Sequence, residues 1–347
     1  MQITLQNTEK GQCYAVRFDR YRQQVVDKLK TAVSVRWWDK STGAWMIPAN
    51  NKCKAELDQL TYYVRHFEPV NWGGNESKTD EDIAYQIPDM PELDEDHGLK
   101  IQPYPYQLQG IARGLQLKRF INGDDMGLGK TLESIATINK ADAFPCLVIC
   151  PNTVKINWQR EWHKFTDKKA MVLTDSVRTS WPFFWQTGMN HVFIVNYESL
   201  RKYFVRRINK SEKWTLKDVE FHNTIKLFKS VIIDESHKVK STATQQSKFC
   251  KGITAGKEWI ILLTGTPVVN KPNDLICQLA IMDRMNDLGG WKYFTSRYCS
   301  GPHGASNLKE LNFMLWKHCF FRREKSKVLT QLPDKVRQIV TLSLIHI

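Results

Sequence analysis

The segment Asp124-Asp-Met-Gly-Leu-Gly-Lys-Thr131 restricts the possible folds of this chain more than any other. It follows a short apolar run at residues 119–122 and precedes a stretch of helical period that begins at Leu132. A strand, a glycine-rich loop and a helix in this order bind phosphate groups in many α/β proteins. The segment therefore predicts a parallel sheet with a nucleotide site at the carboxyl end of one strand.

The residue types of this loop suit phosphate binding. Gly127 and Gly129 allow the backbone to turn so closely that its N–H groups can face a β-phosphate. Lys130 adds a positive charge between the β- and γ-phosphates, and the hydroxyl of Thr131 can bind Mg²⁺. The strict pattern has glycine where this chain has Asp124, so a chance glycine turn is the alternative for this segment alone.

A second segment, Val231–Lys238, is an apolar strand that ends in the adjacent acids Asp234 and Glu235. At the carboxyl edge of a parallel sheet, Asp234 could hold Mg²⁺ and Glu235 could orient and deprotonate a water molecule. The alternative is a helix N-terminus, where acids are also favoured. That alternative does not explain why the pair follows a phosphate loop by about a hundred residues.

From Tyr104 onward, short apolar segments alternate with stretches of helical period. The alternation predicts an α/β fold, a parallel sheet with helices on both faces. Cys146 and Cys150 lie in one of these segments and are expected to be core residues of a buried strand. The expected strands lie at residues 119–123, 146–150, 170–174, 191–196, 230–234 and 259–264.

Residues 1–70 predict a separate small α+β module. Asp19 is the expected N-cap of a first helix, residues 33–48 have the pattern of a β-hairpin, and a second helix is expected at about residues 52–63. Residues 71–98 differ in kind, because they are rich in acids and prolines and hold few apolar residues. This composition predicts an extended acidic linker.

The charge of the chain is unevenly distributed. The formal net charge is +14, but residues 76–96 hold nine acids and one lysine, so the rest of the chain carries +22. Such an excess favours nucleic acid as a partner, although a basic surface that serves only solubility is the alternative.

The eight cysteines show no spacing typical of zinc sites. No apolar run approaches the roughly 18 residues of a membrane helix, and the N-terminus lacks the pattern of a signal peptide. We therefore expect no membrane association and an intracellular protein, cytoplasmic in a prokaryote or phage and nuclear in a eukaryote.

Several segments, in the family's own order, resemble the motifs of the Swi/Snf-type ATPases of helicase superfamily 2. In that family Asp is usual at the first position of motif I, which accounts for Asp124. The segments are Tyr104–Gly110 (adenine contact), Asp124–Thr131 (motif I), Cys150–Glu161 (motif Ia), Asn196–Glu198 (motif Ib), Asp234–His237 (a DEAH-type motif II), Leu263–Pro267 (motif III) and residues 321–335 (the junction between two lobes).

The resemblance implies a RecA-like first lobe over residues 99–335 that uses ATP and Mg²⁺ and binds double-stranded or forked DNA. The implied nucleotide-binding residues are Gln107, Asp124, Gly127, Leu128, Gly129, Lys130 and Thr131. Thr131 and Asp234 would bind the metal, and Lys130, Asp234 and Glu235 would act in catalysis. Residues that would couple hydrolysis to DNA movement are His237, Thr264, Gly265 and Thr266. The implied DNA contacts are Asn152, Thr153, Lys155, Asn196 and Tyr197.

Motors of this superfamily use two RecA-like lobes, and the second lobe supplies arginine fingers. Residues 336–347 would begin the segment between the lobes, so we expect a second lobe in cis or in trans and weak hydrolysis by this chain alone. Neither Arg322 nor Arg323 can be assigned the finger role by position. The implied function is an ATP-dependent DNA translocase in repair or fork remodelling. One alternative is a module that binds ATP and DNA without hydrolysis and acts as a regulator or as one half of a split motor. A more distant alternative is a small-molecule kinase.

Two further segments leave alternatives open. Trp38, Asp39 and Trp45 are similar to the HARP-type DNA-binding module found beside annealing helicases, but a hairpin with tryptophans also serves as a small core. Residues 201–229 hold nine basic and three acidic residues. They form either a second DNA-facing surface or a solvated helical hairpin with a small aromatic core.

Overall fold

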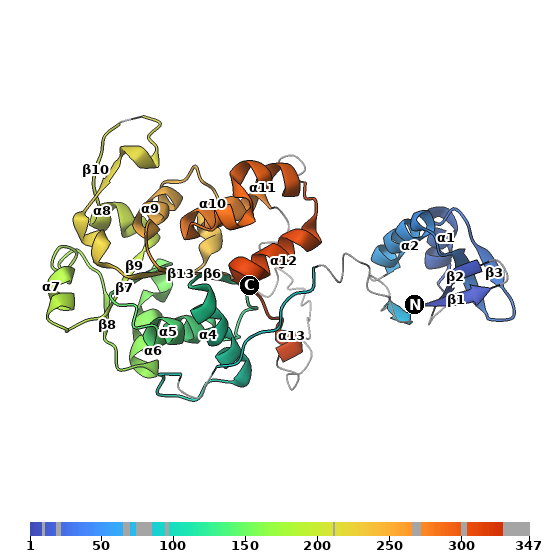
Figure 1. Ribbon diagram of the computed structural model, residues 1–347, viewed down its shortest axis with the longest axis horizontal. Coiled ribbons are helices and arrows are strands. Elements are labelled where there is room, and N and C mark those ends of the chain that lie inside the picture. The colour runs from blue at the N-terminus through green and yellow to red at the C-terminus, as the bar shows by residue number, and fades with distance from the viewer. Residues whose placement is uncertain are drawn as a thin grey trace, which may run out of the picture. The chain divides into compact units, whose positions relative to one another are not determined.

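The computed structural model divides the chain into two compact units, residues 1–84 and 85–347, which we describe separately (Figure 1). The described residues are 1–8, 11–18, 22–64, 70–73, 85–93, 97–210, 212–265, 272–299 and 304–328. Asp19, Thr266 and the predicted inter-lobe residues from 329 onward therefore lie outside the described residues.

The first unit is a five-stranded sheet of order β3-β4-β2-β1-β5 that packs against two helices. Its elements are β1 (Gln2–Thr8), β2 (Gly11–Arg17), α1 (Gln23–Ala32), β3 (Trp37–Asp39), β4 (Ala44–Pro48), α2 (Asn51–Val64) and β5 (Asn71–Gly73). The core lies between the helices and one face of the sheet, where Val25, Leu29, Leu57 and Leu60 meet Ile3. The expected hairpin and second helix are both present.

Two details of this unit correct the sequence analysis. Helix α1 begins at Gln23 and Arg22 holds its N-cap position, so the cap was placed too early at Asp19. The module does not end at residue 70, because Asn71–Gly73 forms β5 and pairs in parallel with β1. Without β5 this edge of β1 would expose unpaired backbone N–H and C=O groups, which explains why a segment with so few apolar residues forms a strand.

The second unit is built on a seven-stranded sheet of order β14-β6-β13-β12-β7-β9-β8 (Figure 1). All neighbouring strands in it are parallel, as predicted. The strands are β6 (Arg119–Asn122), β7 (Cys146–Cys150), β8 (Ala170–Val172), β9 (Val192–Asn196), β12 (Ser230–Ile233), β13 (Trp259–Leu263) and β14 (Phe320–Phe321). Only β14 was not expected, because a strand of two residues leaves no periodic pattern in the sequence.

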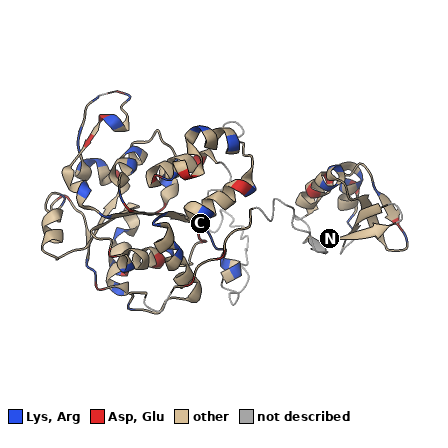
Figure 2. Ribbon diagram, viewed as in Figure 1, with Lys and Arg blue, Asp and Glu red and all other residues tan. Residues whose placement is uncertain are grey.

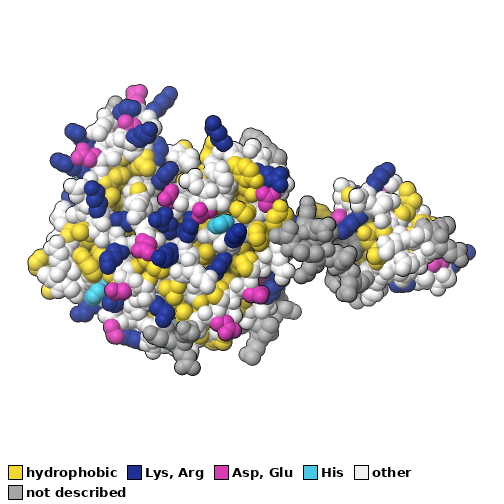
Figure 3. Space-filling view, viewed as in Figure 1, with side chains coloured by type: hydrophobic (Ala, Val, Ile, Leu, Met, Phe, Trp, Pro, Cys, Tyr) yellow, Lys and Arg dark blue, Asp and Glu magenta, His cyan; other side chains and the backbone are white. Residues whose placement is uncertain are grey.

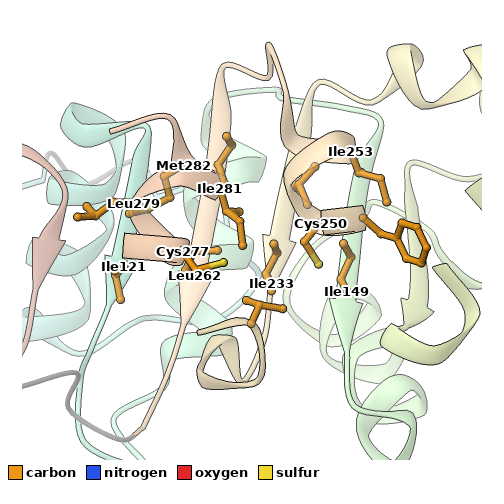
Figure 4. Packing of buried hydrophobic residues seen from close by; sticks show 14 of the residues in the cluster. Ile121, Ile149, Ile233, Cys250, Ile253, Leu262, Cys277, Leu279, Ile281 and Met282 are labelled. Atoms are coloured by element: carbon orange, nitrogen blue, oxygen red, sulfur yellow. The ribbon is translucent and has the colours of Figure 1, made fainter. Parts of the chain in front are cut away.

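Helices cover both faces of this sheet. Along β13, Ile260 and Leu262 point to one apolar cluster while Ile261 and Leu263 point to the other, as the period of two in a strand requires. The first cluster lies under α8 to α12, and Figure 4 shows the strand residues packed against side chains of α9 and α10. The second lies under α4, α5 and α6. The helices are α4 (Pro105–Leu117), α5 (Lys130–Lys140), α6 (Lys155–Phe165), α7 (Trp181–Gln186), α8 (Leu200–Phe204), α9 (Gln245–Thr254), α10 (Asn273–Met282), α11 (Gly290–Tyr298), α12 (Leu308–His318) and α13 (Lys325–Val328).

The basic stretch at residues 201–229 is not a helical hairpin. It contains the short helix α8 and an antiparallel pair of strands, β10 (Val205–Ile208) and β11 (Val219–Phe221), which stand out from the rest of the unit (Figure 1). Trp214 stacks on Phe249 of α9 with ring centroids 5.5 Å apart, so an aromatic contact does hold the stretch in place.

Cysteines and helix lengths bear on two simpler expectations. All eight cysteines are free, and Cys146 and Cys150 are fully buried in β7, as predicted. Among the described residues, every helix is too short or too polar to span a bilayer.

The sheet determines where the predicted motifs meet. Because the strands are parallel, the segments that follow them emerge at one edge. Along this edge the order is Arg322 after β14, the phosphate loop after β6, Thr264 after β13, Asp234 after β12, motif Ia after β7 and motif Ib after β9. Segments far apart in the sequence thus lie side by side.

Candidate nucleotide and nucleic-acid site

The phosphate loop, residues 124–131, has a backbone that only glycine adopts readily at two positions. Gly127 and Gly129 have φ angles of 86° and 87°, in the left-handed region. A Cβ atom on Gly129 would also overlap Nε2 of Gln107. Gly129 is the N-cap of α5, so the loop ends at a helix N-terminus, whose first N–H groups have no partner within the helix. This is a site suited to an anion.

Lys130 folds back across the loop. Its Nζ donates hydrogen bonds to the backbone oxygens of Asp124 at 2.8 Å and Asp125 at 3.2 Å. Burial lowers the pKa of this amine, while the charges of Asp124, Glu235 and Asp234 act in the opposite direction. The amine therefore lies within the field of all three acids.

Asp234 follows β12 and is held by two other segments. The indole Nε1 of Trp158, on α6, donates to Oδ2 of Asp234 at 2.8 Å. The hydroxyl of Tyr197 donates to the backbone oxygen of Asp234 at 2.5 Å. Burial raises the pKa of the Asp234 carboxyl group, although the bond from Trp158 lowers it. Motifs Ia and Ib thus both support the acid of motif II.

Glu235 differs from its neighbour in exposure and backbone. Its side chain is 41% exposed, and its φ angle of 52° lies in the left-handed region, where a residue other than glycine is strained. Nδ1 of His237 lies 3.2 Å from Oε2 of Glu235. Two adjacent carboxylates, one held by hydrogen bonds from two other segments and the other 41% exposed, suit the different roles predicted for a metal ligand and a base.

Motif III lies against the phosphate loop. The backbone N–H of Thr264 donates to the oxygen of Asn122, at the end of β6, over 3.2 Å. A Cβ atom on Gly265 would lie 2.8 Å from Cγ of Met126 and 3.7 Å from Nζ of Lys130. A larger residue at position 265 would therefore displace the loop. Of the predicted coupling residues, only Thr266 lies outside the described part.

Gln107 connects the predicted adenine segment to the phosphate loop. Its Oε1 accepts from the backbone N–H of Tyr104 at 3.0 Å, and its Nε2 donates to the oxygen of Leu128 at 3.1 Å. The side chain is buried and contacts the loop directly. Its predicted role in recognising adenine stays a prediction. The ring of Tyr104 is 63% exposed and stacks on Tyr106 at 5.8 Å, which offers a flat apolar surface at the same place.

The predicted DNA contacts fall into two groups. Asn152 and Thr153 are exposed in a 3₁₀ turn (Asn152–Val154) that precedes α6, and Lys155 is half-buried. Asn196 and Tyr197 are only 8% and 1% exposed, so their side chains are buried, and their contact with DNA stays a prediction. Asn196 accepts from Nζ of Lys155 at 3.3 Å. The two buried side chains therefore bind neighbouring residues at the edge of the sheet instead of facing solvent.

Two residues at the site were missed. The guanidinium of Arg323 lies between the carboxylates of Asp124 and Glu133, and all three side chains are at most 9% exposed. The sequence held one signal, because Glu133 interrupts the apolar face of α5, where an acid needs a buried partner. It held no signal that identified Arg323 as that partner.

A Mg²⁺ ion bound with a nucleotide takes few ligands from the protein and keeps waters and phosphate oxygens around it. Among the described residues, no group of three or more His, Cys, Asp or Glu side chains could hold a metal ion. The donors predicted here, the Thr131 hydroxyl and the Asp234 carboxylate, are oxygen ligands of the kind that Mg²⁺ prefers, and they fit an ion held mainly by phosphates.

Comparison with known proteins gives the family. The pattern of the SNF2-related domain matches residues 39–347. The chain belongs to the SNF2-related domain family. A solved structure, the Sulfolobus solfataricus SWI2/SNF2 ATPase core in complex with dsDNA, is 27% identical with a TM-score of 0.54, and the match covers 70% of this chain and 49% of that one. The predictions of a Swi/Snf-type ATPase lobe and of a RecA-like sheet are confirmed.

Two curated relatives of this SNF2-related chain are much longer. A Xenopus laevis protein named SWI/SNF-related matrix-associated actin-dependent regulator of chromatin subfamily A-like protein 1 is 26% identical over 97% of this chain and 35% of its own length. The human DNA annealing helicase and endonuclease ZRANB3 is 30% identical over 71% of this chain and 23% of its own length. The chain thus spans about a third of the first of these two relatives and about a quarter of the second.

Proposed function

We propose that this chain is the ATP-binding lobe of a DNA-dependent translocase, which uses ATP hydrolysis to move along double-stranded or forked DNA. The observation that carries the proposal is the meeting of Lys130, Asp234, Glu235 and Gly265 at one edge of the sheet. A glycine loop alone would serve many nucleotide-binding proteins. A motor also needs segments that connect the nucleotide site to DNA. Motif III, which contacts the loop, and motifs Ia and Ib, which bind Asp234, are the segments proposed for this connection.

The side chains have distinct roles in this proposal. Lys130 and the N-terminus of α5 would bind the phosphates, and Glu235 would orient and deprotonate the attacking water. Thr131 and Asp234 would hold Mg²⁺, which offsets negative charge on the phosphates. The exposure of Glu235 leaves its carboxylate accessible to water and substrate.

A second RecA-like lobe, in cis or in trans, would complete the active site. The solved ATPase core is about twice as long as the part of it that this chain matches. An arginine supplied from another lobe contributes about 10³ to 10⁵ in rate in related phosphoryl-transfer enzymes. The lobe alone would therefore bind nucleotide and hydrolyse it slowly.

DNA would lie along the edge that carries motifs Ia and Ib. The solved core was determined with double-stranded DNA, and Figure 3 shows Lys and Arg side chains spread over one face of the larger unit. The Xenopus relative also matches the first unit, and for that module we propose a HARP-like role in binding forked DNA. Repair or fork remodelling in the nucleus is the setting that the annealing helicase relative supports.

The test is phosphate release by a protein that joins this chain to a second lobe, measured with and without forked DNA. We expect DNA to stimulate hydrolysis and Lys130→Ala to abolish it. Nucleotide binding with no hydrolysis, with or without DNA, would favour the alternative of a regulatory module. No nucleotide binding at all would contradict both.

A further inference from the structure

The segment that follows α12 runs alongside the phosphate loop. The N–H groups of Ile121, Gly123 and Asp125 donate to the oxygens of Cys319, Phe321 and Arg323 at 2.8, 2.9 and 3.1 Å. The pairing of β6 with β14 therefore continues past the end of β6 and into the loop. Residues about 200 positions apart in the sequence share this ladder.

The contacts of Arg323 reach both ends of the loop region. Its backbone N–H and Nε donate to Oδ1 of Asp124 at 2.7 and 3.2 Å. Its Nη2 donates to Oε1 and Oε2 of Glu133 at 2.6 and 2.7 Å, and its Nη1 donates to the oxygen of Tyr106. Asp124 opens the loop, and Glu133 lies one helical turn after Lys130 on α5.

Aromatic rings, a glycine and an amide pack around the cluster. The rings of Tyr106 and Phe321 lie 5.3 and 5.5 Å from the guanidinium carbon. A Cβ atom on Gly110 would approach Nη2 of Arg323 to 2.8 Å and Cδ of Glu133 to 2.7 Å, so α4 can pack here only through glycine. The amide of Asn122 also donates to Oε2 of Glu133, at 2.9 Å. Every polar atom of the guanidinium that faces the cluster meets an oxygen.

A purely stabilising role is a weak explanation for this arrangement. Buried ion pairs are often no better for stability than apolar residues of the same volume, because desolvation offsets the attraction. What the pair does provide is fixed geometry, since the guanidinium fork binds carboxylates in one plane. The fork also places a positive charge between two acids that would otherwise repel a phosphate bound beside them.

We propose that Arg323 is a positioning residue for nucleotide binding, which fixes the two ends of the phosphate loop through Asp124 and Glu133 and ties them to the segment that leaves the sheet after β14. Asp124 then acts on the nucleotide through the loop rather than by touching it. The inference rests on the proposed nucleotide site and extends it. Movement of the segment after Phe321 would change the affinity of the loop for a nucleoside triphosphate.

The experiment measures the dissociation constant of the full chain for a fluorescent ATP analogue with Mg²⁺, well below the unfolding temperature. Arg323→Gln leaves Asp124 without its partner, and we expect at least a tenfold loss of affinity. Asp124→Asn in the same chain removes the unpaired charge, and we expect it to restore part of that loss. Arg323→Lys keeps the charge without the fork and should bind between the wild type and Arg323→Gln.

Arg284→Lys is the matched control. Arg284 is also partly buried and donates to the oxygens of Leu117 and Arg119, but these lie at the end of α4 and the start of β6, away from the loop. It should change the unfolding temperature without changing the dissociation constant. If Arg323→Gln only lowers the unfolding temperature and binds nucleotide like the wild type, the inference is wrong and the proposed function stands. If the wild type binds no nucleotide, the proposed function itself fails.

Discussion

Polar side chains at the edge of the sheet differ in exposure between the segment after β6 and the segment after β7. Beside β6, Asp124 and Arg323 are buried and bonded to each other. Beside β7, Asn152 and Thr153 are exposed. A phosphate loop must keep one shape to bind one small ligand, whereas a surface for a polymer must stay open along its length. The difference fits a nucleotide site on one side and a nucleic-acid path on the other.

Asp234 lies between these two segments, and its hydrogen bonds come from motifs Ia and Ib. Trp158 and Tyr197, which contact its carboxylate and its backbone, belong to the segments that we expect to face DNA. A displacement of α6 by DNA would therefore move a hydrogen bond on the predicted metal ligand. The comparison predicts that substitutions at the nucleotide half, at the connection and at the exposed half have effects of different size. They should affect the hydrolysis rate, the Mg²⁺ dependence and the affinity for DNA, respectively.

The largest effect is expected at Glu235. Glu235→Gln keeps the shape of the side chain but removes the base, and a positioned base contributes about 10²- to 10⁴-fold to a rate. We expect the hydrolysis rate of the protein with its second lobe to fall by that factor, with nucleotide and DNA affinities unchanged. Glu258→Gln, the same chemical change at an acid whose side chain is 64% exposed, is the control. A decrease below tenfold would mean that another group activates the water.

An intermediate effect is expected at the connection between the halves. Trp158→Phe removes the N–H that binds Oδ2 of Asp234, and removal of such a partner of a metal ligand costs about tenfold or more in metal affinity. We expect a roughly tenfold higher Mg²⁺ concentration for half-maximal hydrolysis, measured by titration with and without DNA.

Helix α6 supplies a control of the same kind. Trp162 is fully buried, but its indole N–H has no hydrogen-bond partner among the described residues. Trp162→Phe makes the same chemical change without touching Asp234, so the Mg²⁺ titration should match the wild type. Equal shifts for both variants would show that packing of α6, rather than the bond to Asp234, sets the Mg²⁺ dependence.

The sequence predicted what depends on local pattern. The strands of the larger sheet are short apolar runs, and glycines mark the phosphate loop, so the order of motifs along the edge could be anticipated. The contact of Arg323 with Asp124 could not, because it joins residues 199 positions apart and rests on a strand of two residues. The sequence did not show that the side chain of Tyr197 is buried, because a motif gives a position along the chain and not the direction of the side chain.

The smallest effect is expected at the exposed half, on the β10–β11 hairpin. A cavity of about 410 Å³ beside it is lined by basic side chains, including Arg206 and Arg207, and by Glu198, which binds Asn196 of motif Ib. Figure 2 shows the Lys and Arg of this hairpin at the margin of the unit. We therefore propose that the expected DNA path continues onto the basic stretch.

Changing Arg206, Arg207 and Lys210 together to Ala tests that path. All three side chains are more than 60% exposed, and among the described residues they pair with Glu220 and with the less exposed Asp218. Exposed pairs of this kind contribute little to stability, so the variant should fold normally. The slope of log affinity against log salt for duplex DNA should decrease by up to about 0.9 for each DNA phosphate that the variant no longer neutralises.

A second triple variant gives the comparison its control. Lys100, Lys118 and Arg119 also form surface ion pairs, but Lys118 and Arg119 lie at the start of β6, at the edge opposite the phosphate loop. Their replacement by Ala removes the same charge from the chain. If both triple variants lower the salt slope equally, DNA responds to net charge alone and the hairpin is a solvated surface. A decrease in the salt slope that is confined to the hairpin variant would show that the DNA-binding surface continues beyond motif Ib.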